Sequence, residues 1–218
     1  MPATKPIMIS EALFMDNMEY MAKFPDRFFD LAPVDPEYGI DAGNMQMGSG
    51  KNKKYSKGNW DKEIPKREYF DELFRVSKNQ IICGGNYFTD FLKPTKSWIF
   101  WDKGINGDCS FADGELFWTS FNSVLRIAPI RYKGFLGTDK DGRIHITQKP
   151  VALYDWIYAK YLPQGGKVLD THLGSGSNRI AADKAGNIDF YSCENDPDHY
   201  EDQEKRWKNY KSQLVLQF

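Results

Sequence analysis

The chain has 218 residues and a mass of 25.2 kDa, which is long enough for one α/β domain with a substantial core. Its formal net charge is -1, so no global basic field draws it to a polyanion and any such attraction must be local. No apolar run approaches the roughly 20 residues that span a bilayer, and the N-terminus lacks the charged-then-apolar pattern of a secretory leader. We therefore expect a single cytoplasmic domain over residues 1–218 without membrane attachment.

The N-terminal half is expected to contain several strands and one clear helix. Residues 67–77 ("REYFDELFRVS") carry apolar side chains at helical spacing. Strands are expected at the apolar runs bounded by turn residues, which are residues 6–9 ("PIMI"), 28–34 ("FFDLAPV"), 80–85 ("QIICGG"), 97–102 ("SWIFWD") and 116–121 ("LFWTSF"). The last of these is expected to continue as a hairpin through residues 123–130 ("SVLRIAPI").

Residues 39–65 interrupt this pattern, because Gly, Asn, Ser and Lys dominate and no apolar period is present. Between positions 51 and 67 the basic residues Lys51, Lys53, Lys54, Lys57, Lys62, Lys66 and Arg67 outnumber the acidic residues Asp61 and Glu63. A loop of this length inside a compact domain is usually functional or disordered. We expect a mobile basic loop, and a solvated loop with no partner is the alternative.

The C-terminal third predicts a parallel sheet. A helix should begin at Pro150, since proline is favoured at the first helical position. A strand at residues 167–170 then leads through a glycine-rich turn into a helix that ends near Gly186. A second strand closes on Glu194, and residues 197–213 form a further helix. Strands and helices that alternate with turns this short imply parallel strands joined by right-handed crossovers.

The glycine-rich turn, "VLDTHLGSGSNRIAA", predicts a nucleotide site. Asp170 ends the strand, and Gly174 and Gly176 let the backbone approach a ligand at the carboxyl ends of the strands. Arg179 occupies the place of the third glycine of the dinucleotide pattern, which argues against a nicotinamide cofactor. Glu194 ends the next strand, where an acid can accept both hydroxyls of a ribose. The alternative is a tight strand-to-helix turn that binds no ligand.

Lys149 comes directly before Pro150 ("HITQKPVAL"). Its charge adds to the dipole of the helix N-terminus, which makes the position a natural seat for a carboxylate. A solvated lysine is the alternative interpretation.

The tetrapeptide "DPEY", from Asp35 to Tyr38, follows an apolar strand and should also lie at the carboxyl edge of the sheet. The Asp35 carboxylate and the Pro36 carbonyl could each accept one hydrogen of an exocyclic amine, while Tyr38 stacks on the flat base that carries it. This arrangement would polarise the nitrogen and direct its lone pair at an electrophile bound next to it. A turn that opens with an acid is the alternative.

The motifs "DPEY", "TQKP" and "VLDTHLGSGS" together resemble the amino-type DNA methyltransferases that use S-adenosylmethionine. The tetrapeptide precedes the glycine-rich loop, and this order resembles the permuted class usually called beta. The segment "DNMEYMAKFPDRFFDLAPVDPEYGI" is similar to the N-terminal signature of that class, in which the position of Asp16 contacts the cofactor's adenine. The resemblance covers about residues 9–211.

The resemblance implies an α/β, Rossmann-like methyltransferase fold, in which helices flank both faces of a mixed seven-stranded sheet with one antiparallel strand. It implies a site-specific DNA methyltransferase that moves a methyl group to the exocyclic amine of a base flipped out of the duplex, with S-adenosylhomocysteine as the other product. A tetrad led by aspartate favours N6 of adenine over N4 of cytosine. The implied partners are double-stranded DNA and a second copy of the chain, and the aromatic-rich residues 97–121 could supply the interface between copies. No metal is implied, and neither the histidines nor the cysteines show the spacing of metal ligands. We interpret the cysteines Cys83, Cys109 and Cys193 as buried reduced thiols.

The resemblance assigns roles to individual residues of this sequence. The catalytic residues would be Asp35, Pro36 and Tyr38. The cofactor would contact Asp16, Asp35, Lys149, Asp170, His172, Leu173, Gly174, Ser175, Gly176 and Glu194. Phosphates of DNA would meet Lys51, Lys53, Lys54 and Lys57 in the loop of residues 39–65, and residues 131–146 form a minimal target-recognition segment.

Three positions depart from the family pattern. Glu37 replaces the second proline of the tetrad, Thr171 replaces the proline of the glycine-rich loop, and His172 replaces its phenylalanine. Glu37 places a negative charge beside the expected amine pocket. The alternatives are therefore a cytosine N4 methyltransferase, a homologue that binds the cofactor without turnover, and a methyltransferase of RNA or of a protein amide. Restriction-modification, phage self-protection and regulation are equally compatible with the sequence, as is a bacterial or a phage origin.

Overall fold

The computed structural model describes residues 8–42, 61–105, 112–131, 144 and 147–215. Eight strands are described: β1 (Ser10–Phe14), β2 (Ala32–Val34), β3 (Gln80–Cys83), β4 (Trp98–Asp102), β5 (Gly114–Thr119), β6 (Arg126–Ala128), β7 (Gly166–Asp170) and β8 (Ile188–Glu194). The described helices are α1 (Asn17–Met21), α2 (Arg67–Val76), α3 (Val151–Tyr161), α4 (Ser177–Ala185) and α5 (Pro197–Val215), with a 3-10 turn, η2, at Gly85–Tyr87.

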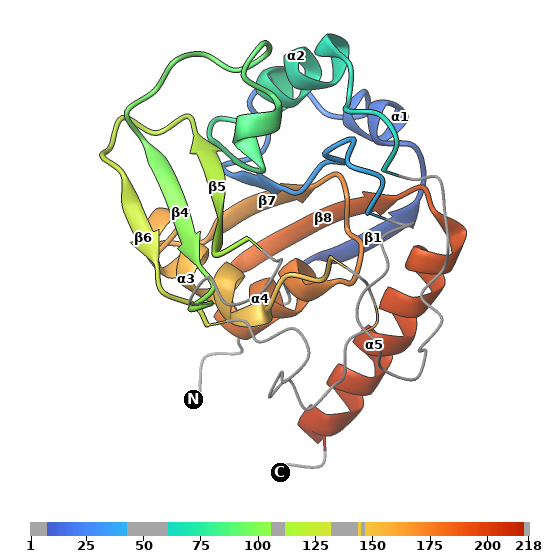
Figure 1. Cartoon of the computed structure of the whole chain (residues 1–218). Coiled ribbons are helices and arrows are strands. Elements are labelled where there is room, and N and C mark those ends of the chain that lie inside the picture. Colours follow the sequence, from blue (N-terminus) through green and yellow to red (C-terminus); the bar gives the residue numbers. More distant parts are fainter. Residues whose placement is uncertain (1–7, 43–60, 106–111, 132–143, 145–146, 216–218) are drawn as a thin grey trace.

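The strands form two sheets that meet at β2 and β7 (Figure 1). One has the order β1-β8-β7 and the other the order β2-β3-β5-β4-β6. Leu31 forms a parallel bridge with Val168, and the Leu169 N–H donates to the Leu31 carbonyl at 3.0 Å. The two pieces therefore continue into each other as one mixed sheet, in which β5 runs antiparallel to both β3 and β4.

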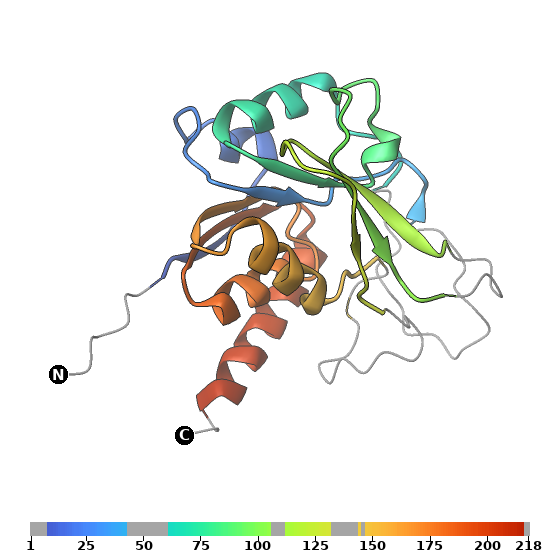
Figure 2. The same cartoon turned by 90° about the vertical axis from the view of Figure 1, so that its left-hand side faces the viewer.

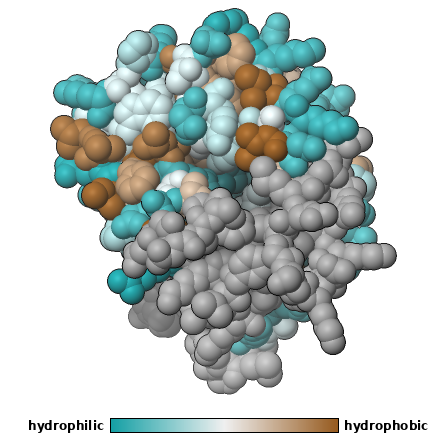
Figure 3. Space-filling view, in the orientation of Figure 1, coloured by the Kyte–Doolittle hydropathy of each residue, from teal (hydrophilic) through white to brown (hydrophobic). Residues whose placement is uncertain are grey.

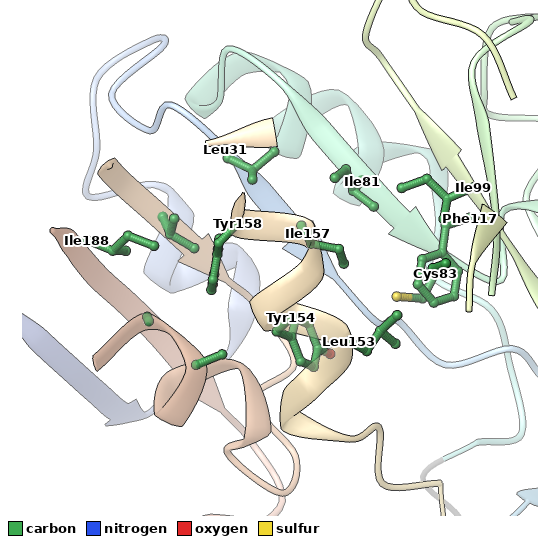
Figure 4. Close-up of a cluster of buried hydrophobic side chains, with 14 of the residues drawn as sticks. Leu31, Ile81, Cys83, Ile99, Phe117, Leu153, Tyr154, Ile157, Tyr158 and Ile188 are labelled. Carbon is green, nitrogen blue, oxygen red and sulfur yellow. The ribbon is translucent and has the colours of Figure 1, made fainter. Parts of the chain in front are cut away.

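Helices cover both faces of this sheet (Figure 2). α1 and α2 lie on one face, and α3, α4 and α5 lie on the other. Each face has its own apolar core. Tyr20, Phe70 and Leu73 belong to the core under α1 and α2, whereas Leu153 and Ile157 of α3 point toward the strands in the opposite core (Figure 4).

The mixed α/β architecture confirms the fold class that the sequence predicts. The helix at residues 67–77 and the strand–helix series of the C-terminal third are confirmed as α2 and as β7, α4, β8 and α5, and the helix expected from Pro150 is α3, with Pro150 as its N-cap. Eight strands are described where the resemblance implies a sheet of seven, and the short β6 lies at the edge of the sheet. Of the predicted first strand, residues 6 and 7 lie outside the described residues, and β1 begins at Ser10.

The predicted hairpin at residues 116–130 is wrong. β6 does not fold back onto β5 but crosses to the far edge of β4, with which it pairs in parallel. The register places Ala128 opposite Trp101, so the small Ala128 side chain is fully buried while Ile127 beside it stays exposed. β5 is already paired on both sides by β3 and β4, which leaves β4 as the edge that β6 can join.

No helix within the described ranges combines the length and the apolar character that a membrane crossing requires.

We expect the core beneath α3 to carry much of the stability. Leu153 is fully buried, whereas Leu125 is 57% exposed. Leu153→Ala should lower the free energy of unfolding by about 2–5 kcal/mol, because the side chain's transfer energy is lost and a cavity is left. The matched variant Leu125→Ala should change it by less than about 0.5 kcal/mol. Urea unfolding followed by circular dichroism measures both values, and equal losses would contradict this picture of the core.

Candidate active site at the carboxyl edge of the sheet

The segments that follow β2 and β7 lie next to each other, because these parallel strands are neighbours and their carboxyl ends share one edge of the sheet. Asn178, at the start of α4, ties the two strands together. Its side-chain amide donates to the Pro33 carbonyl at 3.2 Å and to the Asp170 carboxylate at 2.8 Å. Tyr158 in turn donates to the side-chain oxygen of Asn178. The tetrapeptide at 35–38 and the glycine-rich turn at 171–176 are thus held side by side.

Tyr38 is seated against the turn that follows β3. Gly84 has φ +64°, and a Cβ at this position would lie 2.3 Å from the Tyr38 ring, so the contact requires glycine. The Tyr38 ring also stacks on Tyr87, with ring centroids 4.9 Å apart and planes 14° apart. Tyr87 itself is 43% exposed. An aromatic pair therefore leads from the tetrapeptide to the surface.

A network of charges holds the acid of the tetrapeptide. Lys149 Nζ lies 2.6 Å from one oxygen of Asp35, and the Tyr38 hydroxyl donates to the other oxygen at 2.7 Å. Lys149 also lies 3.3 Å from Glu115 of β5, which pairs with Lys103 at 2.7 Å. Two lysines and two carboxylates therefore alternate, and the network balances its own charge.

Burial and the neighbouring charges have opposite effects on the pKa values of Lys149 and Glu115. Burial lowers the pKa of Lys149, but the carboxylates of Asp35 and Glu115 outweigh it and raise that pKa above its ordinary value. Burial raises the pKa of Glu115, but Lys149 and Lys103 outweigh it and hold that pKa below the usual range. Burial together with the adjacent carboxylates raises the pKa of Tyr38, so its phenol stays a neutral donor.

A second cluster joins the tetrapeptide to the glycine-rich turn. The Glu37 carboxylate lies 3.3 Å from His172 Nε2, and Asn17 Nδ2 lies 3.2 Å from the same nitrogen. The other ring nitrogen, Nδ1, is 2.9 Å from the Thr171 hydroxyl, which is 2.7 Å from the hydroxyl of Tyr69. The three departures from the family pattern, at positions 37, 171 and 172, therefore lie in one connected cluster.

The glycine-rich turn organises a carboxylate on the neighbouring strand. Glu194 accepts hydrogen bonds from the backbone N–H of Gly174 at 2.8 Å and from those of Asn195 and Asp196, each at 3.0 Å. Gly174 has φ +51°, and a Cβ there would meet only the His172 carbonyl, at 3.8 Å, among the described residues within 4 Å. The turn therefore presents open backbone beside an oriented acid.

Asp170 lies beneath this turn rather than at its surface. It is 2% exposed and accepts from the His172 N–H at 3.1 Å as well as from Asn178. Burial, which exceeds the effect of these hydrogen bonds, raises the pKa of Asp170 to about 6. α5 supports the same turn from the other side, since Arg206 donates to the Ser175 carbonyl at 2.8 Å.

The structure brings most of the predicted site residues to this edge. Asp35, Pro36 and Tyr38 follow β2, and residues 170–176 with Glu194 follow β7 and β8. Asp16 is the N-cap of α1, where its carboxylate accepts from the backbone N–H groups of Met18 and Glu19. Lys149 contacts Asp35, so its predicted approach to a cofactor carboxylate remains a prediction.

The predicted DNA-contacting residues Lys51, Lys53, Lys54 and Lys57 lie outside the described residues, as does Cys109 and nearly all of the predicted recognition segment at 131–146. The ends of the basic loop are described, and Asp61 joins them. Its buried carboxylate accepts from the N–H of Gly39 at 2.8 Å and of Ala42 at 3.0 Å. The loop therefore leaves and re-enters the fold directly beside Tyr38.

Sequence reasoning missed Glu115, Lys103, Tyr87 and Asn178. Glu115 lies in a strand that its sequence marks only as apolar. The pair Gly84-Gly85, placed at the end of a buried strand, is the signal that could have indicated a close approach at Tyr38. The described cysteines, Cys83 and Cys193, are buried and free. Across the residues described here, no group of three or more His, Cys, Asp and Glu side chains is arranged to hold a metal ion.

Comparison with known proteins identifies the fold. No family model and no curated protein matches the sequence. Among solved structures, the M1.HpyAVI–SAM complex aligns with a TM-score of 0.58 and 17% identity, over 90% of this chain and 98% of that one. TTHA0409, a putative DNA modification methylase from Thermus thermophilus complexed with S-adenosyl-L-methionine, aligns with a TM-score of 0.57 and 14% identity, over 93% of this chain and 96% of that one.

The PvuII DNA methyltransferase, which is cytosine-N4-specific, aligns with a TM-score of 0.57 and 13% identity, over 96% of this chain and 95% of that one. Coverage is nearly complete on both sides in all three alignments. At these identities the likeness shows a shared α/β methyltransferase fold.

The buried position of Lys149 leads to a stability prediction. Lys149→Met should lower the free energy of unfolding by about 3 kcal/mol, because it leaves the partly buried Asp35 without its counter-charge and Glu115 with Lys103 alone. The control is Lys78→Met, since Lys78 lies 2.6 Å from Asp30, as Lys149 does from Asp35, but with a side chain 43% exposed instead of 5%. Its loss should cost less than about 1 kcal/mol.

The cost of Lys149→Met should also depend on pH. In the native protein the lowered pKa of Glu115 gives stability that is fully present above the ordinary pKa of a glutamate and is lost as the pH falls through the lowered value. Removing Lys149 removes part of that stability. The difference between native and variant should therefore be largest at neutral pH and shrink in acid. Urea unfolding between neutral and acidic pH measures it, and a difference that grows toward acid would contradict the argument.

Proposed function

We propose that the chain transfers a methyl group from S-adenosylmethionine to the N6 amine of adenine in double-stranded DNA. The observation that carries the proposal is the junction of β2 and β7, which puts the Asp35–Tyr38 segment beside the glycine-rich turn and Glu194. The fold, shared with solved structures described as a putative DNA modification methylase and as a DNA methyltransferase, supports it.

The cofactor site fits the residues that are present. The open backbone at Gly174 leaves room for a ligand, and the Glu194 carboxylate is already oriented by three backbone N–H groups to accept ribose hydroxyls. Leu173, His172, Ser175 and Gly176 would line the methionine portion above Asp170, and Asp16 would face the adenine. Lys149 would approach the amino-acid carboxylate with the donor that Asp35 and Glu115 leave, which now meets the Tyr38 hydroxyl at 3.3 Å.

Asp35 and Pro36 would hold the target amine. Both oxygens of Asp35 accept one hydrogen bond each, and a carboxylate oxygen can accept a second. The Asp35 carboxylate and the Pro36 carbonyl would each take one amine hydrogen and leave the nitrogen lone pair free to attack. Tyr38 would stack on the base, with Tyr87 extending the aromatic surface.

When bound, S-adenosylmethionine supplies an electrophilic methyl carbon, whose bond to sulfur breaks as the bond to nitrogen forms, and it leaves as S-adenosylhomocysteine. The protein's contribution is alignment and polarisation. Asp35, which would hold the amine, would also accept the proton that the methylated nitrogen must release. The positive charge that develops on the nitrogen would be stabilised by the same carboxylate.

Methyl incorporation tests this function. With labelled S-adenosylmethionine and unmethylated duplex DNA, the native protein should transfer label, and Asp35→Ala should reduce the rate about 100-fold or more, since it removes the group that polarises the amine. The control Asp71→Ala removes an exposed aspartate of α2 and should keep the native rate. Label transferred equally by Asp35→Ala would exclude this role.

Two alternatives have distinguishable outcomes. A cytosine N4 methyltransferase is favoured by the likeness to the cytosine-N4-specific PvuII enzyme, and chromatography of the hydrolysed DNA would show 4-methylcytosine instead of 6-methyladenine. A homologue that binds cofactor without turnover would incorporate no label, but would gain activity on Glu37→Pro. The setting we propose is the cytoplasm of a bacterium, with the gene carried by the bacterium or a phage, as in restriction-modification.

DNA binding would involve the basic loop, whose described ends flank Tyr38 at Gly39 and Asp61. Replacing Lys51, Lys53, Lys54 and Lys57 together with alanine should weaken duplex binding for all sequences alike. The slope of log affinity against log salt concentration should fall by up to about 3 to 4, because each phosphate contact contributes about 0.9. Fluorescence anisotropy over a salt series measures the slope. An unchanged slope would show that these lysines do not meet phosphates.

A second copy of the chain is the further partner we propose. Leu116, Phe100 and Ile127 lie in register across β5, β4 and β6 on one face of the sheet, and Leu116 and Ile127 are 39% and 61% exposed. Figure 3 shows hydrophobic side chains gathered on this side of the molecule. An apolar surface of this kind supports a self-contact.

A further inference from the structure

Glu37 and His172 come from the two segments that the proposed function needs to align. Glu37 lies between the amine-holding Pro36 and Tyr38, and His172 lies in the glycine-rich turn between Asp170 and Gly174. Their side chains meet at 3.3 Å and are 26% and 12% exposed. A proline and a phenylalanine at these positions could form no polar contact, so this link between the segments is a property of this chain.

His172 Nε2 has two competing partners. In the neutral tautomer that donates Nδ1–H to the Thr171 hydroxyl, Nε2 accepts from the Asn17 amide at 3.2 Å and offers Glu37 nothing. In the imidazolium form, Nε2 carries a proton and donates to Glu37. In the other neutral tautomer Nδ1 accepts from the Thr171 hydroxyl and Nε2–H can donate to Glu37, but without a charge, so only the imidazolium forms an ion pair. One nitrogen cannot accept from Asn17 and donate to Glu37 at once, so protonation of His172 favours the tetrapeptide over α1.

The charges around the pair favour the ionised form. Burial lowers the pKa of His172, but Glu37 outweighs this effect, and with smaller contributions from Glu194 and Asp170 the pKa of His172 is raised. The other side chain packed on the ring is the neutral Tyr69, whose centroid lies 5.3 Å away. Burial raises the pKa of Glu37, but His172 outweighs it and His199 of α5 assists, so that the pKa of Glu37 is lowered.

We infer that Glu37 and His172 form a positioning pair that holds the Asp35–Tyr38 segment against the cofactor turn, and that protonation of His172 strengthens this hold by turning the contact into an ion pair. The inference rests on the proposed function and extends it to a regulation of the same site by pH. Neither residue is assigned to the reacting atoms. Their effect is transmitted through the backbone on either side of Glu37 and through the turn at His172.

The pair is complete only within a pH window. Because the folded pKa of Glu37 is lowered, its contribution is lost as the pH falls through that value. Because the folded pKa of His172 is raised, its contribution is fully present below the unfolded value and is lost as the pH rises through the folded one. Above this window Glu37 is left as an unpaired carboxylate beside the amine pocket, and alignment should be poorest there.

The first experiment measures the interaction between Glu37 and His172 without a methylation assay. Nuclear magnetic resonance titration of the His172 ring, assigned with His172→Gln, should give a pKa above the ordinary range in the native protein and a lower pKa in Glu37→Gln. The control is Glu19→Gln, which removes an exposed glutamate of α1 and should leave the titration unchanged. A native pKa in the ordinary range, or one that Glu37→Gln does not move, would overturn the inference.

The second experiment measures how the Glu37–His172 pair affects the rate of methyl transfer. The native kcat should fall as the pH rises through the measured pKa of His172, with KM for the cofactor changing less. His172→Phe and Glu37→Gln should each lower kcat about tenfold at neutral pH, and the double variant should be no worse than either, as expected for residues that share one interaction. His172→Gln keeps a donor that does not titrate, so whatever its rate at neutral pH, its kcat should lose the fall at high pH.

These results separate the two claims. A native protein that transfers no label but shows the raised, Glu37-dependent pKa of His172 would refute the proposed function and leave the pair in place. An active protein whose high-pH profile is the same in His172→Gln would refute the positioning role and leave the proposed function. Strictly additive losses in the double variant would also refute it.

Discussion

The parallel contact between β2 and β7 is the constraint on which the site depends. It consists of one bridge, Leu31 with Val168, and the backbone hydrogen bonds beside it, yet it fixes the neighbouring ends of two strands that are far apart in the sequence. Asn178 reinforces it by binding Pro33 and Asp170 together. Because both strands leave the sheet at the same edge, the acid-bearing tetrapeptide and the open glycine turn must face each other. The residues of the candidate active site lie along this edge.

The charged side chains at this edge balance one another, and this offsets the energetic cost of removing them from water. Asp35 and Glu115 share Lys149, which is 5% exposed, and Lys103 completes the alternation. An ammonium in this position has three donors, which here meet Asp35, Glu115 and, at 3.3 Å, the Tyr38 hydroxyl, so a further carboxylate would bind by taking the place of that last contact. The predicted seat for a cofactor carboxylate and the observed contact with Asp35 are therefore compatible. They also connect the two halves of the site, because any ligand that draws on Lys149 alters the partner of Asp35.

The sequence predicts those parts of the fold whose signals are local. Pro150 at the N-cap of α3 and Gly186 at the C-cap of α4 mark helix ends through their own backbone preferences. The pairing of β6 is different, because it depends on which strand edge remains free after β5 has inserted between β3 and β4. Glu115 escaped prediction for the same reason. Its neighbours Leu116 and Phe117 mark a strand, but only the antiparallel insertion of that strand brings the carboxylate to Lys149. The proposed function of this site thus depends on tertiary contacts that no short sequence motif indicates.

Glu37 shows how the structure changes the meaning of a substitution. Taken alone, a carboxylate in place of proline adds charge beside the amine pocket and releases a backbone angle. Paired with His172 at 3.3 Å, the same carboxylate has a counter-charge and a second anchor for the backbone that proline would have stiffened. Either residue alone would leave a partly buried group without its partner, which costs more than exchanging both. The two departures from the family pattern are therefore best understood as one change, made on facing segments, that replaces a rigid ring and an aromatic contact by a titratable link.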